Sequence, residues 1–90
     1  MDRYKGKVIV VTGAGGGIGR ASAIRFASEG GSVLAVDFQG EALSKTLKIV
    51  KDAGGDIHGV QSDVGDAEQV RQYLEECVSV FGGVDVLFNN

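Results

Sequence analysis

The sequence predicts an α/β fold in which a doubly wound parallel sheet lies between layers of helices. Short apolar segments alternate along the chain with segments of helical length and periodicity, and pairs of glycines separate them. The first apolar segment runs directly into a glycine-rich turn, which is how a buried strand meets a phosphate-binding loop. Crossovers of this length join parallel strands. We therefore expect a three-layer αβα arrangement, β-α-β-α-β-α-β, with strand order 3-2-1-4.

The first apolar segment, residues 7–11, predicts a central strand because it is β-branched and carries no charge after Lys7. Residues 18–28 predict a helix that is apolar enough to lie on a sheet, and a pair of glycines ends it. The apolar side chains of this helix are Ile18, Ala21, Ile24 and Ala27, with Ala23 and Phe26 beside them. Residues 32–37 predict the second strand.

The pattern repeats in the second half of the chain. Residues 41–53 predict a helix, residues 56–61 a third strand and residues 84–88 a fourth. The apolar face of the second helix consists of Leu43, Leu47 and Val50. Asp66 is placed to cap the third helix, with Gln69 at the capping-box position. The buried stripe of that helix is expected at Val70, Leu74, Cys77, Val78 and Phe81.

The glycine-rich turn predicts a dinucleotide as the ligand. Gly13 allows the chain to turn sharply off the strand, and Gly17 allows the backbone to lie against a pyrophosphate. Gly19 allows the helix to pack close to the sheet. The amides of the first helical turn, from Gly17 through Ile18 to Gly19, would then point at the phosphates along the positive end of the helix dipole.

The spacing of the glycines indicates which kind of loop this is. The strict G-x-G-x-x-G fingerprint does not fit, and a P-loop is excluded because no Gly-Lys-Ser/Thr follows the glycines. Residues 12–19 match T-G-x-x-x-G-x-G, which resembles the cofactor loop of the short-chain dehydrogenase/reductase family. With Gly16 as the middle glycine, they fit the T-G-x-x-G-x-x-G loop of that family's extended branch equally well. The resemblance implies a Rossmann-type fold and a cofactor lined by Gly13, Gly15, Gly16, Gly17, Ile18 and Gly19.

Asp37, at the end of the second predicted strand, indicates NAD as the cofactor. It lies 24 residues after Gly13 (37 − 13), near the offset of about 20 residues at which an acidic side chain accepts hydrogen bonds from the adenosine ribose. A 2′-phosphate would lose that bond, worth roughly 1.5–3 kcal/mol, and would be repelled, so NAD should be preferred more than tenfold. Family members that take NADP usually carry a basic residue where this chain has Gly16 or Phe38. The alternative is that Asp37 merely ends a strand.

Two further pairs of residues match the family. Asp63 and Val64 follow the third strand, where the resemblance implies that the carboxylate accepts from the adenine amino group and the next amide donates to the ring. The alternative is that Asp63 is only a turn residue. Asn89 and Asn90 match the opening of the family's N-N-A-G element, which favours the compact branch. The resemblance implies that Asn89 ties the strand end to the glycine loop and that Asn90 lies along the ribose.

The resemblance implies an oxidoreductase that interconverts an alcohol and a ketone by hydride transfer. Its catalytic groups are Tyr, a Lys four residues later, and Ser. Neither tyrosine fits, since Val8 follows Tyr4 at that distance and Cys77 follows Tyr73. We therefore expect no catalytic residue within this chain.

Two other functions compete with the enzyme hypothesis. One is a nucleotide-binding module that uses the same loop without hydride chemistry. The other is an S-adenosylmethionine methyltransferase, although such enzymes usually carry an acidic residue just before the glycines, where this chain has Val11 and Thr12.

Composition argues against several kinds of partner, cellular location and metal site. A net charge of −3 argues against a nucleic-acid partner, and a charged start followed by a brief apolar run supports neither secretion nor membrane insertion, so we expect a cytoplasmic protein. One histidine and one cysteine cannot assemble a metal site. We expect His58 to face solvent and Cys77 to be a buried apolar group.

The fourth predicted strand, residues 84–88, is apolar and would form an open sheet edge. We therefore expect residues 1–90 to be the amino-terminal part of the NAD(P)-binding Rossmann domain of a longer enzyme. The resemblance implies that the small alcohol or ketone substrate, the catalytic groups and the surfaces of a homo-oligomer belong to the rest of that enzyme.

Overall fold

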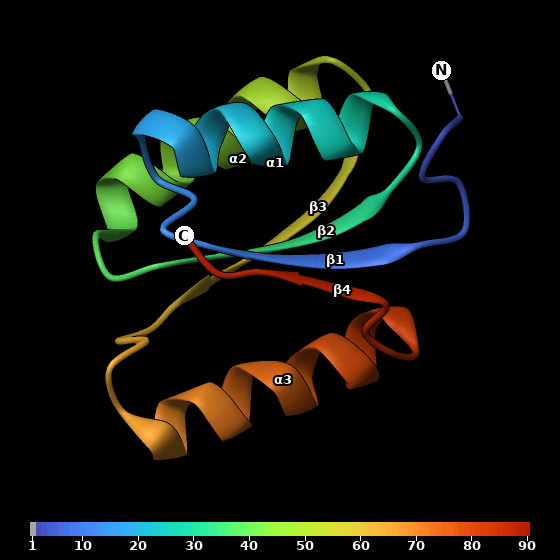
Figure 1. Ribbon diagram of the computed structural model, residues 1–90. Coiled ribbons are helices and arrows are strands. Elements are labelled where there is room, and N and C mark those ends of the chain that lie inside the picture. The colour runs from blue at the N-terminus through green and yellow to red at the C-terminus, as the bar shows by residue number, and fades with distance from the viewer. Residues whose placement is uncertain (1) are drawn as a thin grey trace.

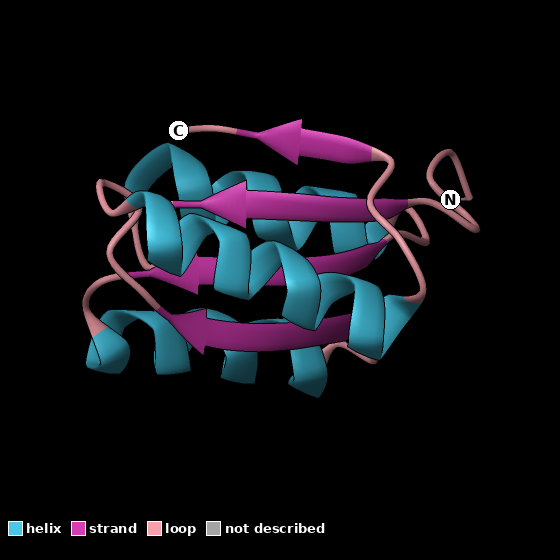
Figure 2. Ribbon diagram, turned by 90° about the horizontal axis from the view of Figure 1, so that it is seen from below, coloured by secondary structure: helices cyan, strands magenta, loops and turns pink. Residues whose placement is uncertain are grey.

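The computed structural model describes residues 2–90, which form a four-stranded parallel sheet with helices on both faces. The strands are β1 (Val8–Thr12), β2 (Ser32–Asp37), β3 (Asp56–Gln61) and β4 (Val86–Phe88), and the helices are α1 (Gly17–Ser28), α2 (Gly40–Asp52) and α3 (Ala67–Phe81). The strand order is β3-β2-β1-β4 (Figures 1 and 2). The predicted doubly wound α/β fold and its 3-2-1-4 order are confirmed.

The side chains of β1 alternate between two hydrophobic cores. Helices α1 and α2 cover one face of the sheet and α3 covers the other (Figure 1). Ile9 and Val11 belong to the core beneath α1 and α2, whereas Val8 and Val10 belong to the core above α3. Every residue of β1 is buried, which explains why its sequence is apolar at successive positions rather than at alternate ones.

The fourth strand is shorter than predicted. Its ladder with β1 begins at Val86, which pairs with Ile9. Ahead of it, Asp85 accepts a hydrogen bond from the Val8 amide through its side chain at 2.8 Å and donates its own amide to the Val8 carbonyl at 2.9 Å. The Asp85 side chain thus accepts a hydrogen bond that a main-chain carbonyl would accept in a regular ladder. The strand therefore starts one residue later, at Val86.

Two predicted helix faces are partly wrong. Ile18 is 69% exposed and Ala21 is also exposed, because α1 packs on the sheet through the smaller residues Gly19, Ala23 and Ala27. In α3, Val78 was expected in the buried stripe and is 53% exposed. Cys77 is buried as predicted, and the other buried residue of that helix is Tyr73, which the predicted stripe did not include.

The capping box predicted for α3 forms only in part. The Asp66 carboxylate accepts hydrogen bonds from the amides of Glu68 and Gln69, as a helix cap does. The Gln69 side chain does not return to Asp66. Its Oε1 accepts from the Asp63 amide at 2.7 Å and from the Ser62 hydroxyl at 3.1 Å, so it secures the loop between β3 and α3.

A buried carboxylate lies at the other end of the sheet, where α1 ends. Glu29 is 3% exposed, and its Oε2 accepts a hydrogen bond from the Arg25 guanidinium. Its Oε1 forms an ion pair with Arg3 at 3.3 Å, and its carbonyl accepts from the Tyr4 amide. The hydrogen bond from Arg25 holds the pKa of the Glu29 carboxyl below its usual range.

Within residues 2–90, no helix is long and apolar enough to cross a membrane.

Candidate functional site

The polar residues predicted from the sequence lie together because parallel strands end at one edge of the sheet. β1 leads into the glycine loop, β2 ends at Asp37, and the segment after β4 carries Asn89 and Asn90. Figure 1 shows the end of the chain beside the turn that enters α1. In open α/β sheets, ligands bind outside this carboxyl edge, at the point where the strand order reverses. Here that point lies between β1 and β4.

The glycine loop is shaped by close approach of the backbone to itself. Gly13 and Gly17 have positive φ angles of 64° and 55°, which side-chain-bearing residues rarely adopt. A Cβ on Gly19 would lie 1.9 Å from the Gly13 carbonyl oxygen, so only glycine allows α1 to begin this close to β1. A Cβ on Gly16 would meet nothing within 4 Å. The predicted functions of Gly13 and Gly19 in shaping the loop therefore have a geometric basis.

The amino end of α1 presents main-chain donors. Its N-cap is Gly16, which has no side chain to accept a hydrogen bond from the helix. The first amides of any α-helix lack partners within the helix, and here they belong to Gly17, Ile18 and Gly19. Ile18 is exposed at this end of the helix. The arrangement favours an anion at the start of α1.

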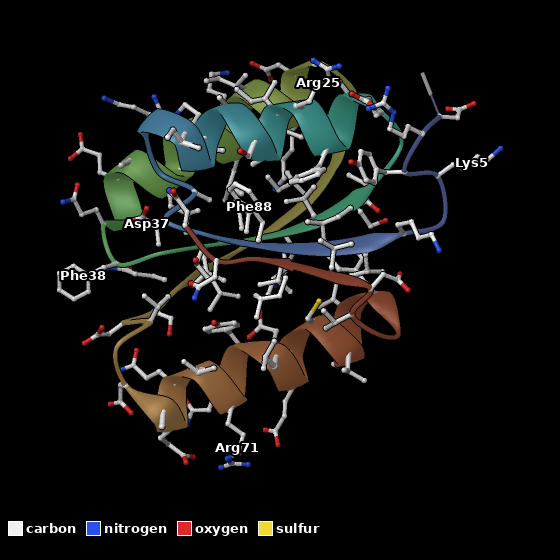
Figure 3. All side chains as sticks on the ribbon, in the orientation of Figure 1. Lys5, Arg25, Asp37, Phe38, Arg71 and Phe88 are labelled. Carbon is white, nitrogen blue, oxygen red and sulfur yellow. The ribbon has the colours of Figure 1, made fainter. Side chains whose placement is uncertain are left out.

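Asp37 lies against the same loop. Its Oδ2 accepts a hydrogen bond from the Gly15 amide at 2.8 Å, and its Oδ1 accepts from the Gln39 amide at 2.8 Å. A Cβ on Gly15 would lie 2.8 Å from Oδ2, so glycine is needed for this contact. Phe38 is 70% exposed and points away from the sheet (Figure 3). Asp37 is therefore oriented by neutral main-chain donors.

Two residues that the sequence analysis missed hold the outer side of the loop. Arg20 donates from Nε to the Thr46 hydroxyl at 2.9 Å, and from one terminal nitrogen to the carbonyls of Gly15 and Ala42. Thr46 is fully buried and donates to the Ala14 carbonyl at 2.7 Å. A polar residue within the apolar face of α2 was the available signal for Thr46. Nothing in the sequence distinguishes Arg20 from other arginines.

The start of the loop is also tied to the end of the chain. The Thr12 hydroxyl donates to the Asn89 side-chain oxygen at 3.0 Å and accepts from the Asn90 amide at 3.0 Å. The Asn90 side chain fills the space beside Gly13 and Gly19, since a Cβ on either glycine would lie 3.0 Å from its Nδ2. These contacts place both asparagines at the loop.

A shallow hollow of about 310 Å³ lies at the end of β3, lined by Phe38, Gln61, Ser62, Asp63 and Gln69. Asp63 is exposed, and its Oδ1 accepts a hydrogen bond from the Gly65 amide at 2.9 Å, which is the contact of a turn residue. Among residues 2–90, no group donates to the other carboxylate oxygen of Asp63. Val64 is 43% exposed beside it.

Comparison with known proteins shows which family this is. Residues 7–90 match the family model described as short chain dehydrogenase. The chain belongs to the short-chain dehydrogenase family.

Relatives within the family have different substrates in their names. The 3-oxoacyl-(acyl-carrier-protein) reductase of Thermotoga maritima is 38% identical over 98% of this chain and 36% of its own length. A hydroxysteroid dehydrogenase structure from Escherichia coli has a TM-score of 0.95 at 33% identity, over 98% of this chain and 37% of that one. A short-chain dehydrogenase from Burkholderia phymatum in complex with NAD has a TM-score of 0.91 at 38% identity, over 97% and 31%. The chain spans about a third of the length of the curated relatives it matches.

Three titratable side chains, those of Tyr73, Cys77 and His58, lie on α3 and β3, away from the glycine loop. Tyr73 is buried against the sheet, which raises the pKa of its phenol, and burial likewise raises the pKa of the Cys77 thiol. His58 is partly exposed and pairs with Glu76 at 2.6 Å. Within residues 2–90, no three His, Cys, Asp or Glu side chains cluster in a way that could hold a metal ion.

Proposed function

We propose that this chain is the NAD-binding part of an oxidoreductase that interconverts an alcohol and a ketone. The observation that carries the proposal is the position of Asp37, whose carboxylate is held against the glycine loop by the Gly15 and Gln39 amides. Family membership and the NAD complex of a similar structure support it. We also propose that residues 1–90 are the amino-terminal part of the cofactor domain and that the catalytic Tyr, Lys and Ser lie elsewhere in the complete protein.

The residues at the carboxyl edge fit a nicotinamide dinucleotide. The first-turn amides of α1 would hold the pyrophosphate, and Asp37 would accept hydrogen bonds from the adenosine ribose. Asp63 and Val64 would bind the adenine, and Asn90 would lie along the ribose. When bound, the cofactor supplies a nicotinamide ring that accepts or donates a hydride. What this chain contributes is binding and orientation.

Electrostatics favours NAD over NADP in this proposal. A ribose 2′-hydroxyl can donate to the Asp37 carboxylate, whereas a 2′-phosphate would bring negative charge toward it. At the two positions where family members that take NADP usually carry a basic residue, this chain has Gly16 and Phe38. Replacing a charged hydrogen bond by repulsion corresponds to a preference of more than tenfold for NAD.

Titration of the complete protein with NAD⁺ and with NADP⁺, by calorimetry, tests the proposal. We expect NAD⁺ to bind at least ten times more tightly. Equal affinities would mean that Asp37 only ends a strand. Absence of binding to either dinucleotide, with binding of S-adenosylmethionine, would favour the methyltransferase alternative. Turnover of alcohols with NAD⁺ then separates an enzyme from a nucleotide-binding module.

The expected homo-oligomer and cytoplasmic location stay predictions, to be checked by light scattering and by fractionation of cells.

A further inference from the structure

The guanidinium of Arg20 is directed at main-chain carbonyls rather than at carboxylates. In the described residues 2–90, Arg3, Arg25 and Arg71 each form an ion pair with a glutamate within 4.0 Å, and Arg20 does not. Its three acceptors are the Thr46 hydroxyl and the carbonyls of Gly15 and Ala42. Arg20 therefore joins the glycine loop to α2 through neutral acceptors alone.

The peptide of Gly15 is held from two sides. Its carbonyl accepts from the Arg20 guanidinium, and its amide donates to Asp37 Oδ2 at 2.8 Å. Gly15 itself is buried, and a Cβ there would lie 3.0 Å from the Cβ of Ala42 as well as against Asp37. Movement of this residue would therefore disturb the carboxylate on one side and the start of α2 on the other.

Thr46 fixes the guanidinium that holds the loop. The hydroxyl accepts from Arg20 Nε at 2.9 Å and donates to the Ala14 carbonyl at 2.7 Å. The Ala14 amide in turn donates to the Val36 carbonyl at 3.0 Å, one residue before Asp37. The chain of hydrogen bonds runs from α2 through Arg20 and the loop back to the end of β2.

We propose that Arg20 is a positioning residue that sets cofactor preference by holding the Gly15 amide on Asp37. This inference rests on the proposed NAD function, since it names a determinant of the same site. Without the guanidinium, the Gly15 peptide is free to tilt, and Asp37 loses a donor that orients its carboxylate. NAD binding then weakens more than NADP binding, because the carboxylate that attracts one cofactor is the group that repels the other. An arginine that only tied α1 to α2 would affect both cofactors equally.

The test compares Arg20→Met, Arg20→Lys and Thr46→Val in the complete protein, with Arg71→Met as the matched control. Arg71 also lies on a helix, where it pairs with Glu68 and Glu75 on the exposed side of α3. Affinities for NAD⁺ and NADP⁺ are measured by calorimetry. We expect Arg20→Met to lower the ratio of the two affinities at least fivefold, and Arg71→Met to leave it unchanged. Lysine keeps the charge but not the planar set of donors, so Arg20→Lys should fall between wild type and Arg20→Met.

Amide hydrogen exchange of Gly15, measured by NMR without cofactor, gives an independent readout. We expect exchange to be at least ten times faster in Arg20→Met and also faster in Thr46→Val. An unchanged ratio of the two affinities, including an equal loss of both, would overturn the proposal. An unchanged Gly15 exchange rate would overturn it as well. If Arg20→Met does not fold, Arg20→Lys and Thr46→Val are judged by the same criteria. Failure of the wild-type protein to bind NAD⁺ would overturn the proposed function and, with it, the inference about cofactor preference. In that case, faster Gly15 exchange in Arg20→Met than in wild type would still show that Arg20 holds the Gly15 amide in place.

Discussion

The two ends of the sheet hold an acidic side chain in opposite ways. At the carboxyl end, Asp37 accepts from the amides of Gly15 and Gln39 and has no cationic partner within 4 Å among residues 2–90. At the amino end, Glu29 is buried between the guanidinium groups of Arg25 and Arg3. Neutral donors orient a carboxylate without cancelling its charge, whereas two arginines neutralise it. The first arrangement leaves an acceptor for a ligand, and the second stabilises the fold.

Main-chain hydrogen bonding also differs between the two ends of the sheet. At the carboxyl end, the start of α1 has unpartnered first-turn amides and a glycine N-cap. At the amino end, Tyr4 donates its amide to the Glu29 carbonyl, and Ser32 donates to the Lys7 carbonyl. Changes at the carboxyl end should therefore alter binding, and changes at the amino end should alter stability alone. Substitutions at each end test that division.

The largest effect is expected from Gly19→Ala. The added Cβ would lie 1.9 Å from the Gly13 carbonyl, so α1 or the loop must move by more than an ångström. We expect a loss of about 3 kcal/mol in the free energy of unfolding, measured in urea, together with loss of NAD⁺ binding. Gly16→Ala is the control for stability, because its Cβ meets nothing and its φ of −169° is open to any residue. Unfolding midpoints that agree for the two variants would contradict this account of the loop.

Asp37→Asn should act on cofactor preference rather than on the fold. The amide keeps one acceptor oxygen but turns a donor toward one of the two main-chain amides, and it carries no charge to repel a phosphate. We expect the ratio of NAD⁺ to NADP⁺ affinity to fall about tenfold. Asp85→Asn is the matched control at the amino end, where Asp85 also accepts from a main-chain amide, that of Val8. A similar change of the ratio in both variants would show that the effect does not come from the site.

The sequence predicted those parts of the site that depend on backbone geometry. The loop glycines and Asp37 were accessible because a tight turn and a strand end restrict which residues fit. Arg20 and Thr46 were not, since their contacts join α1, α2 and the loop across 26 residues of sequence. Ile18 and Val78 were misplaced for a related reason: periodicity identifies a face, but the distance between helix and sheet decides which residue of that face is buried.

Glu29→Gln should lower stability and leave cofactor binding unchanged. Glutamine keeps the shape of the side chain but loses the charge that Arg25 and Arg3 approach. We expect a lower Tm at pH 7 and equal NAD⁺ affinity. Glu75→Gln serves as the control, because Glu75 pairs with Arg71 on the surface, where ion pairs contribute little. A weaker NAD⁺ affinity in Glu29→Gln would show that the two ends are not independent.

The smallest effect is expected in how the difference in Tm between wild type and Glu29→Gln depends on pH. The pKa of Glu29 is lowered in the folded protein by its hydrogen bond from Arg25. A group whose pKa falls on folding stabilises the protein above its unfolded pKa, and this contribution is lost as the pH drops through the folded value. The gap in Tm between wild type and Glu29→Gln should therefore be constant above about pH 5 and should shrink as the pH falls below 4. A gap that does not change with pH would mean that Glu29 stabilises the amino end through packing alone. In that case, charge would not be what separates the two ends.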